Sequence, residues 1–267
     1  MIKFFRRIRQ SLLSENKFSK YSLYALGEII LVVIGILIAL QINNWNTETS
    51  NSKKEKKYLT NLKADLNNQI LEIEEQILRE KLIASEAKII LDYYNKNNTI
   101  VMDSTLAVAG YALADRRTFK TTNPTYTELI NTGDMKLISN ESFRRNLVTY
   151  QQEIVRIKEV IKLNNSSLVD DELAPKIREI IPIFWAKPND YSELTKNNLV
   201  YEGGVSSKNL KALIDISNQN FKNSNILLQF INLASSRYDN AWFHVQIMLT
   251  KKAETQTLLD ELNSLLE

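Results

Sequence analysis

Few side chains in this chain are of a type and spacing that could do chemistry. The sequence contains one histidine, His244, and no cysteine. A single histidine excludes multi-histidine metal sites such as H-E-x-x-H, and no Glu stands three residues before it as in di-iron bundles. His244 follows the run Ala241-Trp242-Phe243. This setting favours a histidine packed inside the protein, with its nitrogens satisfied, over a ligand or a general base.

Asp170, Asp171 and Glu172 form the densest group of carboxylates, at the expected end of a helix. Adjacent carboxylates can bind calcium or act in acid–base chemistry, but at a helix end we expect them to be solvated. The sequence also contains no glycine-rich phosphate loop and no G-x-S-x-G motif. We therefore predict that the protein is not an enzyme and has no catalytic, cofactor-binding or metal-binding residues.

The element that organises the chain is the stretch 21–42, YSLYALGEIILVVIGILIALQI, whose one charge is Glu28. As a helix it is roughly 33 Å long, enough to cross a hydrocarbon core of about 30 Å. No A-x-A cleavage site follows it. We predict an uncleaved transmembrane helix in the lipid bilayer, preceded by a leader (1–20) and followed by a helical domain (43–267).

Charge predicts the orientation of this helix. Residues 1–42 contain six basic and two acidic side chains, a balance of +4, and the remaining 28 basic and 29 acidic residues give −1. The basic excess flanks the membrane, so we expect no nucleic-acid partner. The positive-inside rule places the N-terminus in the cytoplasm. The leader is either an interfacial helix or simply the positive flank, and the expected interfacial anchors are Lys20, Tyr21 and Trp45.

Glu28 is the polar residue most expected to have a function, because a carboxyl within a membrane span is costly unless it is paired or reaches water. At helical spacing it shares a face with Val32, Gly35 and Ala39. Gly35 and Ala39 form a small-xxx-small pair that permits close helix approach. Two interpretations are open: this face packs against a partner helix or a second copy, or Glu28 reaches outward to lipid heads and water.

Helix breakers are rare, with six glycines and four prolines. None lies between Gly35 and Gly110, between Gly133 and Pro175, or after Gly204. These windows predict an all-α protein in which the transmembrane helix is followed by an elongated antiparallel helical bundle. We expect three long helices, with shorter helices between them at the end distal to the membrane.

The first long helix is expected from about residue 49 to 95, with its continuity into the span left open. Its apolar stripe has 3-4-4 spacing and is less regular after Ile77, where two lysines occupy stripe positions. The stripe comprises Leu59, Leu62, Leu66, Ile70, Ile73, Ile77, Lys81, Ala84 and Lys88. The second covers 143–168 with spacings of 4 and 3, and Asn164 on that stripe either fixes register or lies at an exposed end. The third is expected over 207–267.

Shorter elements are predicted from capping signals. Asp103 caps a helix over 104–115, and Asn123-Pro124 opens another that ends at Gly133, with Thr125 and Glu128 as a capping box. The echo between ISNESFR (138–144) and ISNQNFK (216–222) predicts the same helix start twice, with Ser139 and Ser217 as N-caps. The proline-rich part (174–205) predicts short turns and a loop, with an apolar cluster covering the bundle end, comprising Ile180, Ile181, Ile183, Phe184 and Trp185.

Two family resemblances arise from the span. EIILVVIGILIA is similar to the N-terminal helix of type IV pilins, but prepilin processing needs a Gly with Glu fifth after it, and that position is Leu23 here. KFFRRIRQSLLSENKFSKY, ALGEIILVVIGILIALQINNWN and TYTELINTGDMKLISNESFRRNL instead resemble an uncharacterised family of Bacteroidota single-pass membrane proteins. That resemblance implies a bacterial inner (cytoplasmic) membrane and a periplasmic helical domain, and it implies no catalytic residues.

Two functions follow as hypotheses. The first is a membrane-anchored scaffold or protein-interaction module, with a protein partner or a second copy bound through the transmembrane helix and the bundle surface. The alternative is a periplasmic small-molecule sensor that acts through a membrane partner. A pocket lined by Trp185, Tyr191 or Trp242 would favour sensing, whereas a solid core would favour a scaffold.

Overall fold

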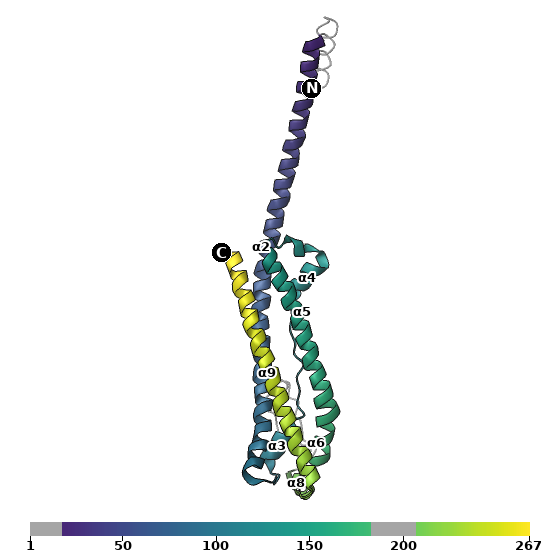
Figure 1. Ribbon diagram of the computed structural model, residues 1–267, viewed down its shortest axis with the longest axis vertical. Coiled ribbons are helices and arrows are strands. Elements are labelled where there is room, and N and C mark those ends of the chain that lie inside the picture. The colour runs from purple at the N-terminus through teal and green to yellow at the C-terminus, as the bar shows by residue number, and fades with distance from the viewer. Residues whose placement is uncertain (1–17, 183–206) are drawn as a thin grey trace. The chain divides into compact units, whose positions relative to one another are not determined.

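A computed structural model describes residues 18–182 and 207–267 of the chain (Figure 1). Within these ranges every regular element is a helix, which confirms the all-α fold. The chain divides into two compact units, Met1–Tyr58 and Leu59–Glu267. The first helix, α2 (Phe18–Asn97), contributes to both units without a break. The sequence had left that continuity open.

In the first unit, the described part of α2 exposes its apolar side chains. Thirteen Leu, Ile and Val side chains between Leu23 and Ile42 are exposed by 47–76%. An 18-residue window here has a mean hydropathy of 2.6, and none of it is buried within the protein. Among the described helices, this one is long and apolar enough to cross a membrane, by length and composition. The leader falls almost entirely in 1–17, outside the described residues.

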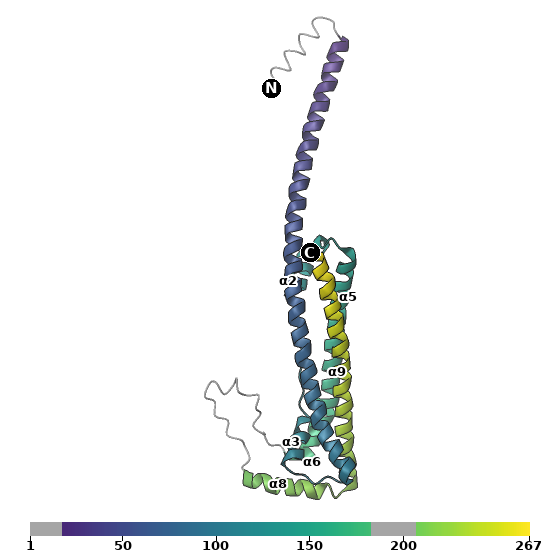
Figure 2. The same cartoon turned by 90° about the vertical axis from the view of Figure 1, so that its left-hand side faces the viewer.

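The second unit contains the rest of α2 and a series of further helices (Figures 1 and 2). The long ones are α5 (Glu141–Asn164) and α9 (Ser224–Leu266). The short ones are α3 (Ser104–Ala112), α4 (Pro124–Thr132), the 3₁₀ turn η1 (Asp134–Leu137), the π-helical turn η2 (Asn165–Leu173), α6 (Ala174–Ile180) and α8 (Ser207–Asn220).

The three long helices of this unit run in two directions. At one level of the bundle, Tyr150 of α5 contacts Gln69 of α2 and Thr255 of α9. At another level, His244 of α9 contacts Glu80 of α2 and Asn164 of α5. Residue numbers therefore rise together along α2 and α5 and fall along α9. α9 is antiparallel to the other two, which are parallel to each other.

This arrangement is possible because residues 113–123, the return segment, run back along the bundle between α3 and α4 (Figure 1). Leu113 and Phe119 anchor the return segment in the core, with exposures of 0% and 1%. The segment places α4 at the opposite end of the bundle from α3. The prediction that the short helices lie together at one end is therefore wrong for α4.

The buried face of α2 follows the predicted stripe as far as Ile77 and then departs from it. Leu59, Leu62, Leu66 and Ile73 are buried, whereas Lys81 and Lys88 are exposed. The buried positions beyond Ile77 are Glu80, Ile83, Ala84, Ala87 and Ile90. From Leu66 on, the buried positions Leu66, Gln69, Ile73, Gln76, Glu80, Ile83, Ala87 and Ile90 are alternately 3 and 4 residues apart, so the buried face follows a seven-residue rhythm and leaves the lysines in solvent.

Several helix boundaries confirm the capping signals. Asp103 is the N-cap of α3, and its side chain accepts a hydrogen bond from the Leu106 N–H at 2.8 Å. Gly133 ends α4 with φ of +72°, a left-handed conformation that glycine adopts without strain. The capping box of α4 is wrong, however. Thr125 is buried in its first turn, and its N–H donates instead to the Asp65 carboxylate of α2 at 2.9 Å.

The predicted repeat of one helix start is also wrong. α5 is capped by Asn140, not Ser139, and the Asn140 side chain accepts from the Phe143 N–H at 2.8 Å. Ser217 lies inside α8, where its hydroxyl donates to the Leu213 carbonyl. α8 ends at Asn220 and Asn223 caps α9, so the third long helix begins later than expected. The two similar segments therefore have different structures: 138–144 contains the start of α5, and 216–222 contains the end of α8.

The long run from α5 to α6 continues through the π-helical turn η2, which the sequence did not predict. The wider turn shifts the buried face, so Asn165 and Val169 are buried and the predicted Leu168 is only half-buried. Pro175 is accommodated in the first turn of α6, where its missing N–H is not needed. Ile180 and Ile181 join the core, while Ile183, Phe184 and Trp185 lie outside the described residues.

Candidate functional site

The proposed packing face in the span lies on the exposed surface of α2. Val32 is 55% exposed, and a Cβ added at Gly35 would meet nothing within 4 Å. Ala39 is also exposed, and Glu28 is half-buried. Trp45 is 68% exposed, as an interfacial anchor requires. The side chains of Lys20 and Tyr21 lie outside the described residues.

The second unit contains a group of buried polar side chains that joins its three long helices. This charged layer comprises Gln76 and Glu80 of α2, Asn164 at the end of α5, and Arg237 and His244 of α9. Glu80 is 1% exposed, and Arg237 and His244 are 0% exposed. Burying a charge is costly unless it is paired and hydrogen-bonded, so every group here needs a partner.

His244 is satisfied at both ring nitrogens, as the sequence predicted. The Asn164 amide nitrogen lies 3.1 Å from His244 Nε2, and Glu80 Oε1 lies 3.1 Å from His244 Nδ1. Because an amide N–H donates, Nε2 accepts in this orientation and Nδ1 carries the proton that is donated to Glu80. Gln76 Nε2 donates to the same Glu80 oxygen at 2.9 Å. Asn164 therefore lies on the inner face rather than at an exposed end.

Arg237 connects this layer to the return segment. Its Nε donates to the Leu113 carbonyl at 3.2 Å, and its Nη2 donates to the Asp115 carbonyl at 3.0 Å. Its Nη1 lies 3.8 Å from Glu80 Oε2. Burial lowers the pKa of the Arg237 guanidinium, and the Glu80 and Asp115 carboxylates oppose that shift. Arg237 thus binds the carbonyls that follow α3 and also balances the buried carboxylate.

A second polar layer, the tyrosine layer, lies further along the bundle and comprises Gln69, Tyr150, Lys251 and Thr255. The Tyr150 hydroxyl lies 2.8 Å from both Gln69 Oε1 and Thr255 Oγ1. Gln69 Nε2 donates to the Thr122 carbonyl of the return segment at 2.9 Å, and Lys251 Nζ lies 5.4 Å from the centre of the Tyr150 ring. Burial raises the pKa of Tyr150 to about 12.

The chemistry of both layers is structural. Glu80 and His244 could exchange a proton, but neither is more than 1% exposed, so a substrate has no access to them. Their hydrogen bonds form only when α2, α5, α9 and the return segment lie in this register. Glu80 Oε2 has no hydrogen bond and only the 3.8 Å ion pair with Arg237. A buried polar layer whose other groups find partners in one register disfavours the remaining registers.

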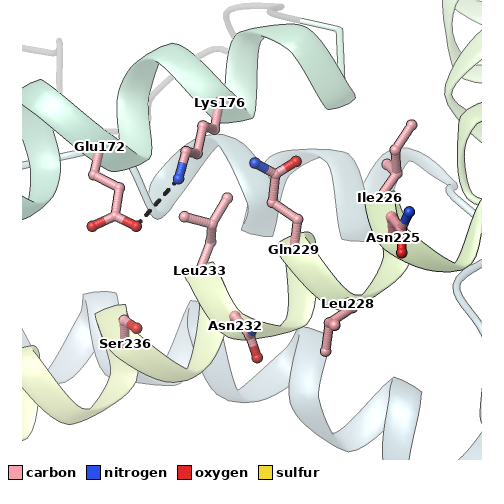
Figure 3. Close-up of a pocket in the computed structure, with 9 residues that line it drawn as sticks. All are labelled: Glu172, Lys176, Asn225, Ile226, Leu228, Gln229, Asn232, Leu233 and Ser236. Atoms are coloured by element: carbon pink, nitrogen blue, oxygen red, sulfur yellow. Dashed lines mark hydrogen bonds and ion pairs between the residues drawn. The ribbon is translucent and has the colours of Figure 1, made fainter.

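The three adjacent carboxylates are exposed, and two of them form surface ion pairs. Asp170 pairs with Arg116 of the return segment, and Glu172 pairs with Lys176 at 3.3 Å. Glu172 and Lys176 lie at one side of a surface cavity of about 450 Å³ between η2, α6 and α9 (Figure 3). Its other lining residues are Asn225, Ile226, Leu228, Gln229, Asn232, Leu233 and Ser236.

This cavity differs from the pocket expected of a sensor. Trp242 is not part of its lining, and Trp185 and Tyr191 lie outside the described residues. It is a surface recess near the start of α9, and its lining includes none of the residues of the two polar layers. The core beside it is filled by a large apolar cluster that includes Phe221 and Phe230, whose ring centres are 5.1 Å apart.

Sequence reasoning missed Glu80, Arg237, Gln69 and Tyr150 as connected polar groups. One signal was present: Gln69, Ile73, Gln76 and Glu80 follow spacings of 4, 3 and 4. Polar residues that occupy the inward positions of a helical stripe indicate a buried hydrogen-bonded layer. Tyr150, the partner of Gln69, and His244, the partner of Glu80, lie 81 and 164 residues away in the sequence, so spacing gave no indication of these contacts.

Comparison with known protein families finds a match for part of the chain. Residues 28–144 match a family of unknown function, DUF6090. The match begins at Glu28, covers the rest of α2 together with α3, the return segment and α4, and ends in the first turn of α5. No curated protein and no solved structure matches the chain.

Proposed function

We propose that the protein is a single-pass inner-membrane protein of a bacterium, with a periplasmic helical domain that serves as a scaffold or interaction module for other proteins. The observation that carries this proposal is the apolar window of α2, which has a mean hydropathy of 2.6 and is not buried by the rest of the protein. Transfer of its exposed side chains from water into hydrocarbon is favourable by on the order of 10–20 kcal/mol. A bilayer is the solvent that this segment fits.

The orientation rests on charge. The six basic residues before the span favour a cytoplasmic N-terminus, and the second unit then lies in the periplasm. The resemblance of the N-terminal sequence to Bacteroidota membrane proteins supports the same location.

The topology is tested with introduced cysteines, because the chain has none of its own. In Ser52→Cys the thiol follows the span, and in Ser11→Cys it precedes the span. We expect a membrane-impermeant maleimide, applied to intact cells with a permeabilised outer membrane, to label Ser52→Cys and to label Ser11→Cys only after lysis. The reverse pattern, or loss of the protein from the carbonate-washed membrane fraction, would refute the proposal.

The interaction role is tested within the membrane. We expect Gly35→Cys, on the proposed packing face with Glu28, Val32 and Ala39, to crosslink to a partner helix. Leu37→Cys is the matched control because it lies half a turn away and is 59% exposed. Equal crosslinking at the two positions would contradict a preferred face. Mass spectrometry of the crosslinked species would show whether the partner is another protein or a second copy.

A further inference from the structure

The part of α2 in the second unit exposes a second apolar stripe, opposite its buried face. This outer stripe comprises Leu71, Glu75, Leu78, Leu82, Ser85 and Ile89, and all six are exposed. Its four apolar members are exposed by 62%, 59%, 57% and 38%. The buried residues Ile73, Glu80 and Ala87 lie on the other side of the helix, packed within the unit.

The outer stripe has the spacing of a coiled-coil interface. Successive members are 4, 3, 4, 3 and 4 residues apart, which corresponds to alternating d and a positions of a heptad. From Leu71 to Ile89 it extends over 19 residues, or about 27 Å of helix. An exposed heptad stripe beside a complete core is unusual for a monomer and indicates a helix partner.

The charges beside the outer stripe identify a suitable partner. In a parallel pair of helices, each g residue lies beside the e residue five positions later on the partner. Here these pairs are Glu74 with Arg79 and Lys81 with Glu86, so both bring opposite charges together when the partner is a second copy of this chain. Glu74 and Arg79 also have ion-pair partners within the chain, Lys252 at 2.6 Å and Glu75 at 2.9 Å, so the Lys81–Glu86 pair carries most of this preference.

An antiparallel pair of the same stripes is less favourable. With Leu78 opposite Leu82, it brings Arg79 near Arg79 and Lys81 near Lys81 of the other copy. It also brings Glu72 near Glu86. Like charges at these positions are destabilising, so the charge pattern favours the parallel arrangement.

We propose that the outer stripe of α2 is the interface of a parallel dimer formed by two copies of this chain. The proposal rests on the proposed membrane anchoring, because a seam this short gains enough stability only when both copies are concentrated in one membrane. Glu75 is the unfavourable member, since it faces its own copy in a parallel pair. Arg79 lies 2.9 Å from Glu75 within the chain and offsets that charge.

The test uses single cysteines in the full-length protein in membranes. Leu78 is a d position, which meets itself across a parallel pair, so Leu78→Cys is expected to form an oxidised dimer. Val155→Cys on α5 is the matched control, because Val155 is equally exposed at 63% but lies outside the outer stripe. Equal dimer yields from the two variants, or no dimer from Leu78→Cys, would overturn the proposal.

Charge variants in the Leu78→Cys background test the direction. Lys81→Glu places like charges beside Glu86 twice in the symmetric dimer, and we expect it to weaken dimerisation by about tenfold. The double variant with Glu86→Lys restores opposite charges and is expected to recover the crosslink. Stronger crosslinking between co-expressed Leu78→Cys and Leu82→Cys chains than within either would indicate an antiparallel pair and refute the proposal.

The outcome is separable from that of the proposed function. If the variants are absent from the carbonate-washed membrane fraction, the membrane anchoring itself fails. If they are present there and Gly35→Cys still captures a partner, while Leu78→Cys does not dimerise, only the outer-stripe interface is refuted.

Discussion

Replacement of Arg237 by Met should destabilise the helical domain more than loss of any surface ion pair. Arg237 is fully buried, and it donates to the Leu113 and Asp115 carbonyls and to Asn240 Oδ1 at 3.0–3.2 Å. Met fills a similar volume but leaves the Leu113 carbonyl without its donor and Glu80 without the neighbouring cation. Removal of one partner of a buried charged pair costs about 3–5 kcal/mol. Because Glu80 keeps its Gln76 and His244 contacts, we expect the lower part of that range, about 3–4 kcal/mol.

The assay is thermal unfolding of the full-length protein in detergent, followed by circular dichroism at 222 nm. For a domain of this size the loss corresponds to a fall in Tm of about 6–16 °C. Arg145→Met is the matched control, because Arg145 pairs with Glu141 on the surface and both are about two-thirds exposed. That change should alter stability by no more than about 0.5 kcal/mol. Equal Tm values for the two variants would show that the charged layer contributes nothing, and would refute the argument.

A companion variant separates charge from hydrogen bonding. Adding Glu80→Gln to Arg237→Met removes the uncompensated carboxylate, so the double variant should be more stable than Arg237→Met alone. If the double variant is instead less stable by the full sum of the two single effects, Arg237 acts only through the return-segment carbonyls.

Three further predictions use the same unfolding assay. The folded-state pKa of Tyr150, about 12, lies above the ordinary value of about 10. The folded protein therefore binds more protons than the unfolded chain between these pH values. The stability that Tyr150 contributes is complete below about pH 10 and is lost toward pH 12, by about 3 kcal/mol. Tyr150→Phe should remove that part of the alkaline loss, and identical pH profiles for the two proteins would contradict it. Asn140→Ala should cost about 1 kcal/mol through loss of the α5 cap, and no change would indicate that the Phe143 N–H has another acceptor. Gly133→Ala should cost about 1–2 kcal/mol because an Ala side chain at φ of +72° is strained, and an unchanged Tm would show that α4 can end in another way.

Prediction from sequence succeeded where the signal is local. Asp103 and Gly133 are boundary residues whose side chain, or lack of one, acts on the adjacent backbone, so type and position were sufficient. The helix α2 ends at Asn97, two residues beyond the expected end at about residue 95, and Asn98 takes a left-handed φ of 53°. The repeat of Ser139 and Ser217 shows the limit of such signals. Neighbouring residues alone do not determine whether I-S-N begins or ends a helix.

The sequence by itself determined that the chain is all-α and that residues 21–42 are apolar enough to span a membrane. Both conclusions depend on composition and spacing within one segment. The absence of glycine and proline favours a helical backbone locally, and an unbroken apolar run is sufficient to indicate a membrane span. Only the tertiary structure decided that α2 and α5 are parallel, that the return segment lies against them, and that Glu80, Arg237 and His244 meet. Those contacts join residues up to 164 positions apart, between Glu80 and His244. Their energy depends on burial and mutual geometry, and neither exists until the helices have packed.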